Sequence, residues 1–389
     1  MSASRWEGPL LATITAVLVT VGIVAVYGAS SLLTTSGGQV GATFALRQGM
    51  GAVVGGVLAI AAARVDYRHW RRLAWPLVGV AALLLLVPLL PFARPIAPTI
   101  NGARRWVDLG LVTVQPSEFA KFVIVVWTAM LAAKKGEQLR SFGRGMAPFL
   151  VILVPVVLMI FLEPHLSMAL LVTLLAGTVL FAAGARLGHF LLLAAVALPA
   201  VYAGITRVGW RAARLDAFLN PDLPSAAGWQ VHQSLVGIGQ GRLFGVGLGQ
   251  GQQKLGYLRY AYSDFIFSTI AEEWGFVGVL VLVLLFGVFI WVGVRIARAA
   301  PDAFGRLLAV GLTASVGISA VLHIGVSLGV VPATGLTLPF VSYGRSSLVV
   351  SLVTAGVLAS VGHARGRGRG NGGRGRGAVG TGRAETARA

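Results

Sequence analysis

One carboxylate stands at the mouth of the longest apolar run in the second half of the chain. In "RYAYSDFIFSTIAEEWGFVGVL", Asp264 precedes apolar residues that continue, broken only by Glu272 and Glu273, to about Val294. A partly buried carboxylate has a raised pKa and can act as a general base near neutral pH. Aspartate is also a common N-cap, whose side chain accepts backbone N–H bonds where a helix begins. The local sequence therefore leaves two roles open for Asp264, proton transfer and helix capping.

A second charged group lies in "PSEFAK", at the start of another apolar run. Glu118 and Lys121 are three residues apart and share a helix face, where an ion pair can form. Pro116 suits the first turn of such a helix, and an acidic residue suits its positive end. Charges within a membrane segment are candidates for function. Structural pairing and direct substrate contact remain equally open for Glu118 and Lys121.

The composition indicates that these groups are held by membrane helices. The chain is 56% hydrophobic and 12% charged, with a mean hydropathy of +0.81, a balance that no soluble domain of this length needs. A hydrocarbon core of about 30 Å requires about 20 apolar residues per helix. The sequence predicts an all-α polytopic membrane protein with about ten transmembrane helices, near residues 10–31, 44–64, 73–91, 117–133, 147–162, 166–184, 188–206, 264–294, 306–329 and 345–361.

The basic residues of the short loops predict the orientation of these helices. They lie in alternate loops, whereas the loops 32–43, 163–165 and 330–344 contain no lysine or arginine. Because short cytoplasmic loops are enriched in basic residues, both termini are predicted to be cytoplasmic. Asp264 then lies at the outer face.

Two outer connections are long and basic, against this trend. They are 92–116, and 207–263, which forms a large extracytoplasmic loop between the seventh and eighth helices. Translocated cations oppose the orienting bias, so we expect them to have a use. Arginine and lysine on an outer surface fit an anionic ligand, and phosphate matches the planar fork of arginine.

The C-terminal segment differs from the rest of the chain. Residues 363–389 are rich in glycine and arginine and have too few apolar residues to fold. We therefore divide the chain into a membrane domain, 1–362, and a disordered basic cytoplasmic tail, 363–389. Gly-Arg repeats can bind RNA, but beside a bilayer attraction to anionic lipid is favoured, and no nucleic acid partner is expected.

Four stretches depart from plain hydrophobic helix: "NGARRWVDLGLVTVQPSEFAKF" (101–122), "EPHLSMAL" (163–170), the segment 228–275 and "LPFVSYGRSS" (338–347). In this order, across ten spans, they resemble the SEDS family of bacterial cell-wall polymerases, the FtsW, RodA and SpoVE group. "NGARRW" and "GLGQGQQKLGYL" are more similar to its FtsW branch, which acts in division, than to its RodA branch.

The resemblance implies a peptidoglycan glycosyltransferase of the bacterial cytoplasmic membrane. Members of the family polymerise lipid II at the outer face, for septal wall synthesis and cell shape, and release undecaprenyl pyrophosphate. They work with a class B penicillin-binding protein, a transpeptidase, and with other components of the divisome.

The resemblance also implies site residues. Asp264 matches the aspartate of the family motif "(H/Y)(T/S)DFIF", where it is regarded as essential, which favours catalysis over capping. Arg104 and Arg105 are candidates for pyrophosphate binding, with placement at the membrane interface as the alternative. The remaining candidates for substrate binding are Glu118, Lys121, Gln233, Ser234, Lys254 and Arg345.

A divalent cation, Mg²⁺ or Mn²⁺, is a candidate cofactor. The chain has no cysteine, so oxygen or histidine must hold any metal. Glu272 follows Asp264 by eight residues, a helical spacing that places both on roughly one face. Glu272 is thus either a second cation ligand or the partner of a basic residue.

Three positions depart from the family pattern. His165 stands where the family has aspartate, Arg345 where it has glycine, and His323 where it has asparagine. Core histidines are commoner than functional ones, so His323 is expected to be structural. For Arg345 the sequence suggests an ion pair with Glu163 or direct contact with pyrophosphate.

Two other classes of function remain as alternatives. A lipid II flippase or transporter would show paired interrupted helices in two related halves, and no such repeat is visible. A non-enzymatic scaffold that recruits a transpeptidase would tolerate loss of Asp264.

Overall fold

The computed structural model describes residues 6–30, 42–100, 102–110, 112–220 and 225–370. Most of the predicted loop 32–43 and the part of the predicted tail beyond residue 370 lie outside these ranges.

Helices dominate the described residues. Nine are long and apolar enough to cross a membrane, and α6 is apolar but shorter. The predicted all-helical membrane fold is therefore confirmed. The helices are α1 (Glu7–Ser30), α2 (Ala42–Arg64), α3 (Arg68–Leu86), α4 (Pro116–Lys135), α5 (Ala147–Leu162), α6 (Leu166–Ala182), α7 (Leu187–Thr206), α8 (Gly209–Leu219), α9 (Ala226–Gly241), α10 (Ile266–Arg298), α11 (Ala303–Ser327) and α12 (Arg345–Gly370).

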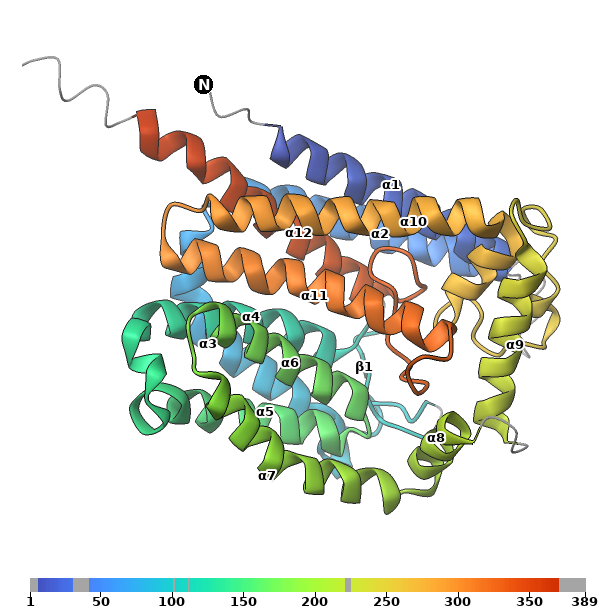
Figure 1. Cartoon of the computed structure of the whole chain (residues 1–389), viewed down its shortest axis with the longest axis horizontal. Coiled ribbons are helices and arrows are strands. Elements are labelled where there is room, and N and C mark those ends of the chain that lie inside the picture. Colours follow the sequence, from blue (N-terminus) through green and yellow to red (C-terminus); the bar gives the residue numbers. More distant parts are fainter. Residues whose placement is uncertain (1–5, 31–41, 101, 111, 221–224, 371–389) are drawn as a thin grey trace, which may run out of the picture.

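The bundle is built around α4, α6, α11 and α12. α4 is buried along most of its length and packs against α3, α6 and α11. α2 packs along α12, and α10 along α11. α7 has no buried residue and lies at the edge of the bundle (Figure 1). Its apolar side chains therefore face the surroundings of the protein, as expected for a helix that contacts lipid.

The two ends of the bundle differ. α1 begins and α12 ends at one end, whereas α8 and α9 lie at the other (Figure 1). The α12 backbone continues as helix to Gly370, past the predicted start of the tail at residue 363. The division of the chain at residue 362 and the disorder of the tail stay predictions.

The connections at the α9 end contain structure that the sequence did not reveal. Residues 92–116 include a small antiparallel hairpin of β1 (Val107–Asp108) and β2 (Thr113–Val114). Residues 207–263 include α8 and α9. The glycine-rich segment 237–251 is helical as far as Gly241.

Residues 242–247 form backbone hydrogen bonds with both sides of a break in α10. At Gly275 the backbone leaves the helical region, with φ 68° and ψ −167°. The nitrogens of Val246 and Gly247 donate to the carbonyls of Glu272 and Glu273 at 3.0 and 3.1 Å. Beyond the break, Phe276 N donates to Arg242 O at 2.9 Å. The outer loop thus satisfies backbone groups that an interrupted helix leaves unpaired, and it fixes the short piece of α10 that follows Asp264.

Candidate active site

Asp264 lies in the turn that leads into α10. Its backbone nitrogen donates to Tyr260 O at 3.0 Å, and the Ser263 hydroxyl donates to Asp264 Oδ1 at 3.0 Å. The N-cap of α10 is Phe265, and no side chain caps this helix. The capping role considered for Asp264 is therefore absent, and its carboxylate remains available for chemistry.

The surroundings of Asp264 adjust its acidity. Burial raises the pKa of the Asp264 carboxyl above its ordinary value, while the Ser263 hydroxyl, Arg214 and Arg105 oppose that rise. A carboxylate with a raised pKa is a stronger base than one in water, which suits it to accept a proton from a hydroxyl group.

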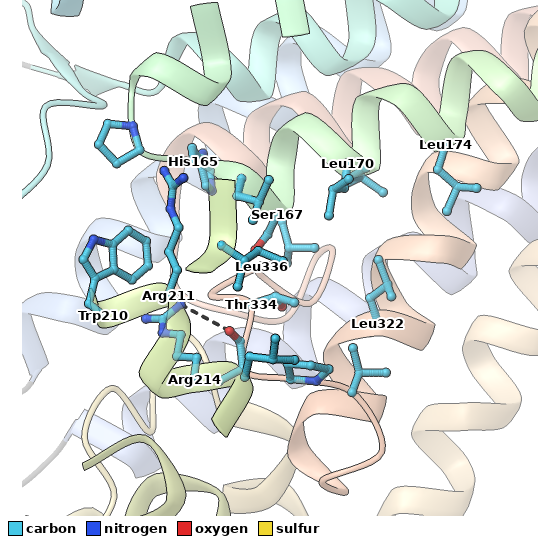
Figure 2. A pocket seen from close by; sticks show the side chains of 18 of the residues that line it. His165, Ser167, Leu170, Leu174, Trp210, Arg211, Arg214, Leu322, Thr334 and Leu336 are labelled. Carbon is cyan, nitrogen blue, oxygen red and sulfur yellow. Dashed lines mark hydrogen bonds between the residues drawn. The ribbon is translucent and has the colours of Figure 1, made fainter. Parts of the chain in front are cut away.

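A cavity of about 300 Å³ lies between α6, α8, α11 and the segment 331–336. Arg105, Arg211 and Arg214 supply its charged lining, whereas α6 and α11 supply apolar walls. Figure 2 shows Arg211 and Arg214 together with Leu170 and Leu174 of α6 and Leu322 of α11. The apolar side chains include Leu166, Leu170, Leu171, Leu174, Ile205, Leu215, Leu322 and Leu336. Positive charge beside an apolar trough fits a ligand with an anionic head and a hydrocarbon tail.

Two of the arginines come from α8, where a spacing of three residues puts them near one face. The Cζ atom of Arg211 lies 4.8 Å from the ring centroid of Phe161 and 5.2 Å from that of Trp210. Its Nη1 donates to Gly204 O at 3.0 Å. Arg214 lies over Trp210 at 5.2 Å and donates to Ala333 O at 3.2 Å, the contact drawn in Figure 2. These contacts orient the guanidinium groups before any ligand binds.

The three arginines are only partly compensated by acids in the described part of the chain, where Asp264 acts electrostatically on Arg105 and Arg214. None of them forms an ion pair there, and the Nε atoms of Arg105 and Arg211 are buried without a hydrogen-bond partner. Burial, followed by the neighbouring Arg214, lowers the pKa of Arg105, yet guanidinium stays protonated in proteins. Cations without an ion-pair partner favour an anionic ligand.

Glu163 lies next to this group, in the turn between α5 and α6. It is 1% exposed, and neither carboxyl oxygen has a hydrogen-bond partner among the described residues. Burial raises the pKa of Glu163 to about 9, and the opposing effect of Arg105 is smaller. Glu163 is therefore neutral at physiological pH and does not neutralise Arg105.

His165 follows in the same turn and is also neutral. Its Nδ1 lies 3.3 Å from Ser117 Oγ and 3.4 Å from Gln115 Nε2. Burial, together with the smaller effects of Arg105 and Lys121, lowers the pKa of His165 to about 3. The difference from a family aspartate is therefore the loss of one negative charge, without a positive charge in its place.

The structure brings some of the predicted residues to this site. Arg105 lines the cavity and acts electrostatically on Asp264. Lys121 and Glu118 form a buried ion pair, with Nζ 2.6 Å from Oε2, and Lys121 is close enough to act on His165. Arg104 is directed elsewhere and donates to Leu90 O at 3.3 Å.

Other predicted residues have structural partners. Lys254 is buried, with Nζ 3.0 Å from Glu273 Oε1, 3.1 Å from Gly28 O and 2.6 Å from Gly249 O. The Ser234 hydroxyl contacts Ser268 and donates to Ser327 O at 2.7 Å. Neither Lys254 nor Ser234 lines the cavity, and Gln233 does not line it either.

Glu272 does not join Asp264. Its Oε1 accepts from the backbone nitrogens of Gln252 at 2.6 Å and Gln253 at 3.3 Å. The helical-face argument fails because Asp264 precedes the first turn of α10. Among the described residues no group of three or more acidic, histidine or cysteine side chains could hold a metal. A divalent cation would therefore depend on Asp264 and on phosphate oxygens of a ligand, a mode that Mg²⁺ commonly uses.

Arg345 does not pair with Glu163 in the structure. It is the first residue of α12, and Gly51 of α2 lies beside it, since a Cβ at Gly51 would meet Arg345 Cγ at 3.6 Å. His323 is fully buried, and its Nδ1 lies 2.8 Å from Leu336 O, in keeping with a structural role.

Arg211, Arg214 and Glu163 were not among the site residues that the sequence predicted. The one available signal for the two arginines was the amphipathic spacing in "GWRAARL". For Glu163 the signal was an acidic residue between two apolar runs.

Comparison with known proteins shows the family of this chain. Residues 9–366 match the family model FTSW_RODA_SPOVE, described as cell cycle protein. The chain is 41% identical over 345 residues to "Probable peptidoglycan glycosyltransferase FtsW" of Trichlorobacter lovleyi, covering 88% of this chain and 90% of the relative. It is 38% identical over 356 residues to "Stage V sporulation protein E" of Bacillus subtilis, covering 90% and 96%.

Solved structures show the same fold. A chain from the work "Structural coordination of polymerization and crosslinking by a peptidoglycan synthase complex" matches with a TM-score of 0.74 and 29% identity, over 94% of this chain and 99% of the other. The rod shape determining protein RodA of Thermus thermophilus matches with a TM-score of 0.66 and 29% identity, over 91% and 96%. The chain belongs to the FtsW/RodA/SpoVE family of multi-pass membrane proteins.

Proposed function

We propose that this protein is a peptidoglycan glycosyltransferase that polymerises lipid II at the outer face of the bacterial cytoplasmic membrane, in septal wall synthesis and cell shape. The observation that carries the proposal is the partly buried Asp264 near a cavity with three unpaired arginines and apolar walls. Relatives that carry the name peptidoglycan glycosyltransferase support it.

The reaction joins two sugars and releases a pyrophosphate. Asp264 takes the proton of the acceptor 4-hydroxyl as that oxygen forms a bond to the anomeric carbon of the donor. The bond between this carbon and the pyrophosphate oxygen breaks, and its electron pair leaves with the pyrophosphate. A base within hydrogen-bond reach of the attacking hydroxyl contributes typically about 10²- to 10⁴-fold to such a rate.

The arginines stabilise the leaving group. Negative charge grows on the pyrophosphate as the bond breaks, and oriented guanidinium groups in a site of low polarity oppose it strongly. Arg105, Arg211 and Arg214 lie on the charged side of the cavity, while the leucines of α6 offer a surface for the polyprenyl chain. The cavity thus matches both parts of an undecaprenyl pyrophosphate ligand.

The orientation proposed from the basic loops places this chemistry outside the cytoplasm, where a transpeptidase can crosslink the product. A class B penicillin-binding protein and divisome components are the proposed partners. The similar chain from a peptidoglycan synthase complex, whose description joins polymerisation with crosslinking, supports a partner of this kind.

Purified protein supplied with fluorescent lipid II, with and without the partner, tests the proposal. We expect glycan strands from the parent protein and none from Asp264→Asn, which retains the shape of the side chain. Asp108→Asn, an outer-face change at a carboxylate that binds Gly110 N, is the matched control and should retain activity. Translocation without polymer would identify a flippase, and neither product would indicate a scaffold.

The two adjacent arginines offer a second test. Arg105→Ala should raise the lipid II concentration needed for half-maximal rate, because it removes a cavity cation. Arg104→Ala should have a smaller effect, because Arg104 binds Leu90 O instead. Equal effects of the two variants would contradict a direct role of Arg105 in substrate binding.

A further inference from the structure

A glutamine on α2 reaches a loop far along the chain. Gln48 is fully buried, and both ends of its amide are used on one segment. Its Nε2 donates to Ser342 O at 2.9 Å, and its Oε1 accepts from Gly344 N at 3.3 Å. A buried amide that satisfies two backbone groups of one loop fixes the path of that loop.

The same loop holds the turn that carries Asp264. The Ser342 hydroxyl donates to Ser263 O at 2.7 Å and accepts from Leu338 N at 2.8 Å. Tyr343 N donates to Tyr262 O at 3.0 Å. Hence the carbonyls of both residues that precede Asp264 are bound by the loop that Gln48 supports.

Aromatic packing adds a second contact between α2 and this turn. Phe44 is one helical turn before Gln48, on the same face. Its ring centroid lies 4.9 Å from that of Tyr262 and 5.0 Å from that of Tyr343, and the two tyrosine rings are 5.7 Å apart. α2 thus supports the turn through one polar and one aromatic contact.

We propose that Gln48 is a positioning residue for Asp264, acting through the segment 342–344 and Ser263. The inference rests on the proposed function, in which Asp264 is the base. The last link is the Ser263 hydroxyl, which donates to Asp264 Oδ1. A base must lie within hydrogen-bond reach of the proton it removes, and a shift of about 1 Å can cost on the order of 100-fold in rate.

The network predicts a change in pH dependence as well as in rate. The groups that act on Asp264 are Arg214 of α8, Arg105 of the outer connection, and Ser263 of its own turn, and Tyr262 is close enough to interact with it. The Ser263 hydroxyl lowers the pKa of Asp264. If the loop relaxes and that bond weakens, the pKa rises, and the acid limb of the rate profile moves to higher pH.

The experiment compares Gln48→Leu with the parent protein in full-length, purified form. Leucine has a similar size but cannot bind Ser342 O or Gly344 N. We expect kcat to fall by about 10-fold or more, KM for lipid II to change little, and the acid limb to move to higher pH. Ser342→Ala, a smaller change that removes the middle link, should behave in the same way and carries the test if Gln48→Leu does not fold.

Ser360→Ala is the matched control. Ser360 on α12 donates to Val65 O at 2.6 Å, so it also joins α12 to the α2 side, but at the opposite end of α2. The Ser360→Ala variant should have a lower thermal stability, without the fall in kcat or the change in the pH profile of the rate. A kcat for Gln48→Leu equal to that of Ser360→Ala, or a lower kcat with an unchanged profile, would overturn the inference. Failure of the proposed function is distinguishable, because the parent protein would then make no polymer.

Discussion

The buried acid Glu163 makes the stability of this protein depend on pH, and Glu163→Gln should remove that dependence. Burial raises the pKa of Glu163 from an ordinary value of 4.5 to about 9. The folded state therefore holds a proton that the unfolded chain has released. The contribution of this group to stability is fully present below about pH 4.5 and is lost progressively as the pH rises towards about 9.

The size of the effect follows from the difference between the two pKa values. Each pH unit in this window costs about 1.36 kcal/mol. At about pH 7.5, roughly three units above the ordinary value, ionisation in the unfolded chain lowers the free energy of unfolding by about 4 kcal/mol. Glutamine has the shape of the neutral acid and cannot ionise, so Glu163→Gln should regain most of this energy.

Thermal unfolding of the purified protein, followed by tryptophan fluorescence from about pH 5.5 to 8.5, measures the difference. The Tm of the parent should fall relative to that of Glu163→Gln as the pH rises. Glu137→Gln, at an exposed acid after α4, should show the pH dependence of the parent. Parallel curves for the parent and Glu163→Gln would refute the burial argument, because they would show that Glu163 ionises equally in both states.

Two further predictions concern the outer segments that surround the site. Lys254→Met should lower the free energy of unfolding by about 3–5 kcal/mol, because it leaves Glu273 buried without its partner. Adding Glu273→Leu should restore much of this free energy. If thermal melts of the double variant show no recovery, loss of pairing is not the cause. Gly275→Ala should be severely destabilising, since φ is 68° and a Cβ would lie 2.3 Å from Gly245 N. Gly287→Ala in the same helix is the control: its Cβ would meet nothing within 4 Å, so it should be neutral or stabilising by about 1 kcal/mol. Similar yields of folded protein from the two glycine variants would contradict the close backbone pairing between residues 242–247 and α10.

The helices were predictable because the bilayer sets one length for all of them. The predicted segment 147–162 coincides with α5, and 188–206 differs from α7 by one residue at its start. Hydropathy reports whether a residue can lie in hydrocarbon, and it is blind to the path of the backbone. The break at Gly275 was missed for this reason, since the apolar run continues through it and the groups that stabilise the break come from residues 242–247.

The candidate site was only partly predictable. The sequence motif identified Asp264, and the reversed charge bias of the outer connections pointed to Arg105. Arg211 and Arg214 were visible as outer cations, but nothing local shows that α8 turns them towards a cavity walled by α6 and α11. The role proposed for Gln48 depends on a contact with a loop almost three hundred residues away, which no spacing rule can reveal.

The errors among the charged residues share one physical cause. A sequence shows that a charge exists but not whether the fold supplies its counter-charge. Lys254 and Arg105 are both basic residues of outer connections, yet Lys254 is neutralised by Glu273, whereas the acid beside Arg105 holds its proton. The cost of burying Lys254 is offset within the protein, while that of burying Arg105 is offset only in part by the charge of Asp264 until an anion binds. The cations that can recognise pyrophosphate are therefore those that the folded chain leaves unpaired, and partner geometry, rather than charge count, separates them from structural ones.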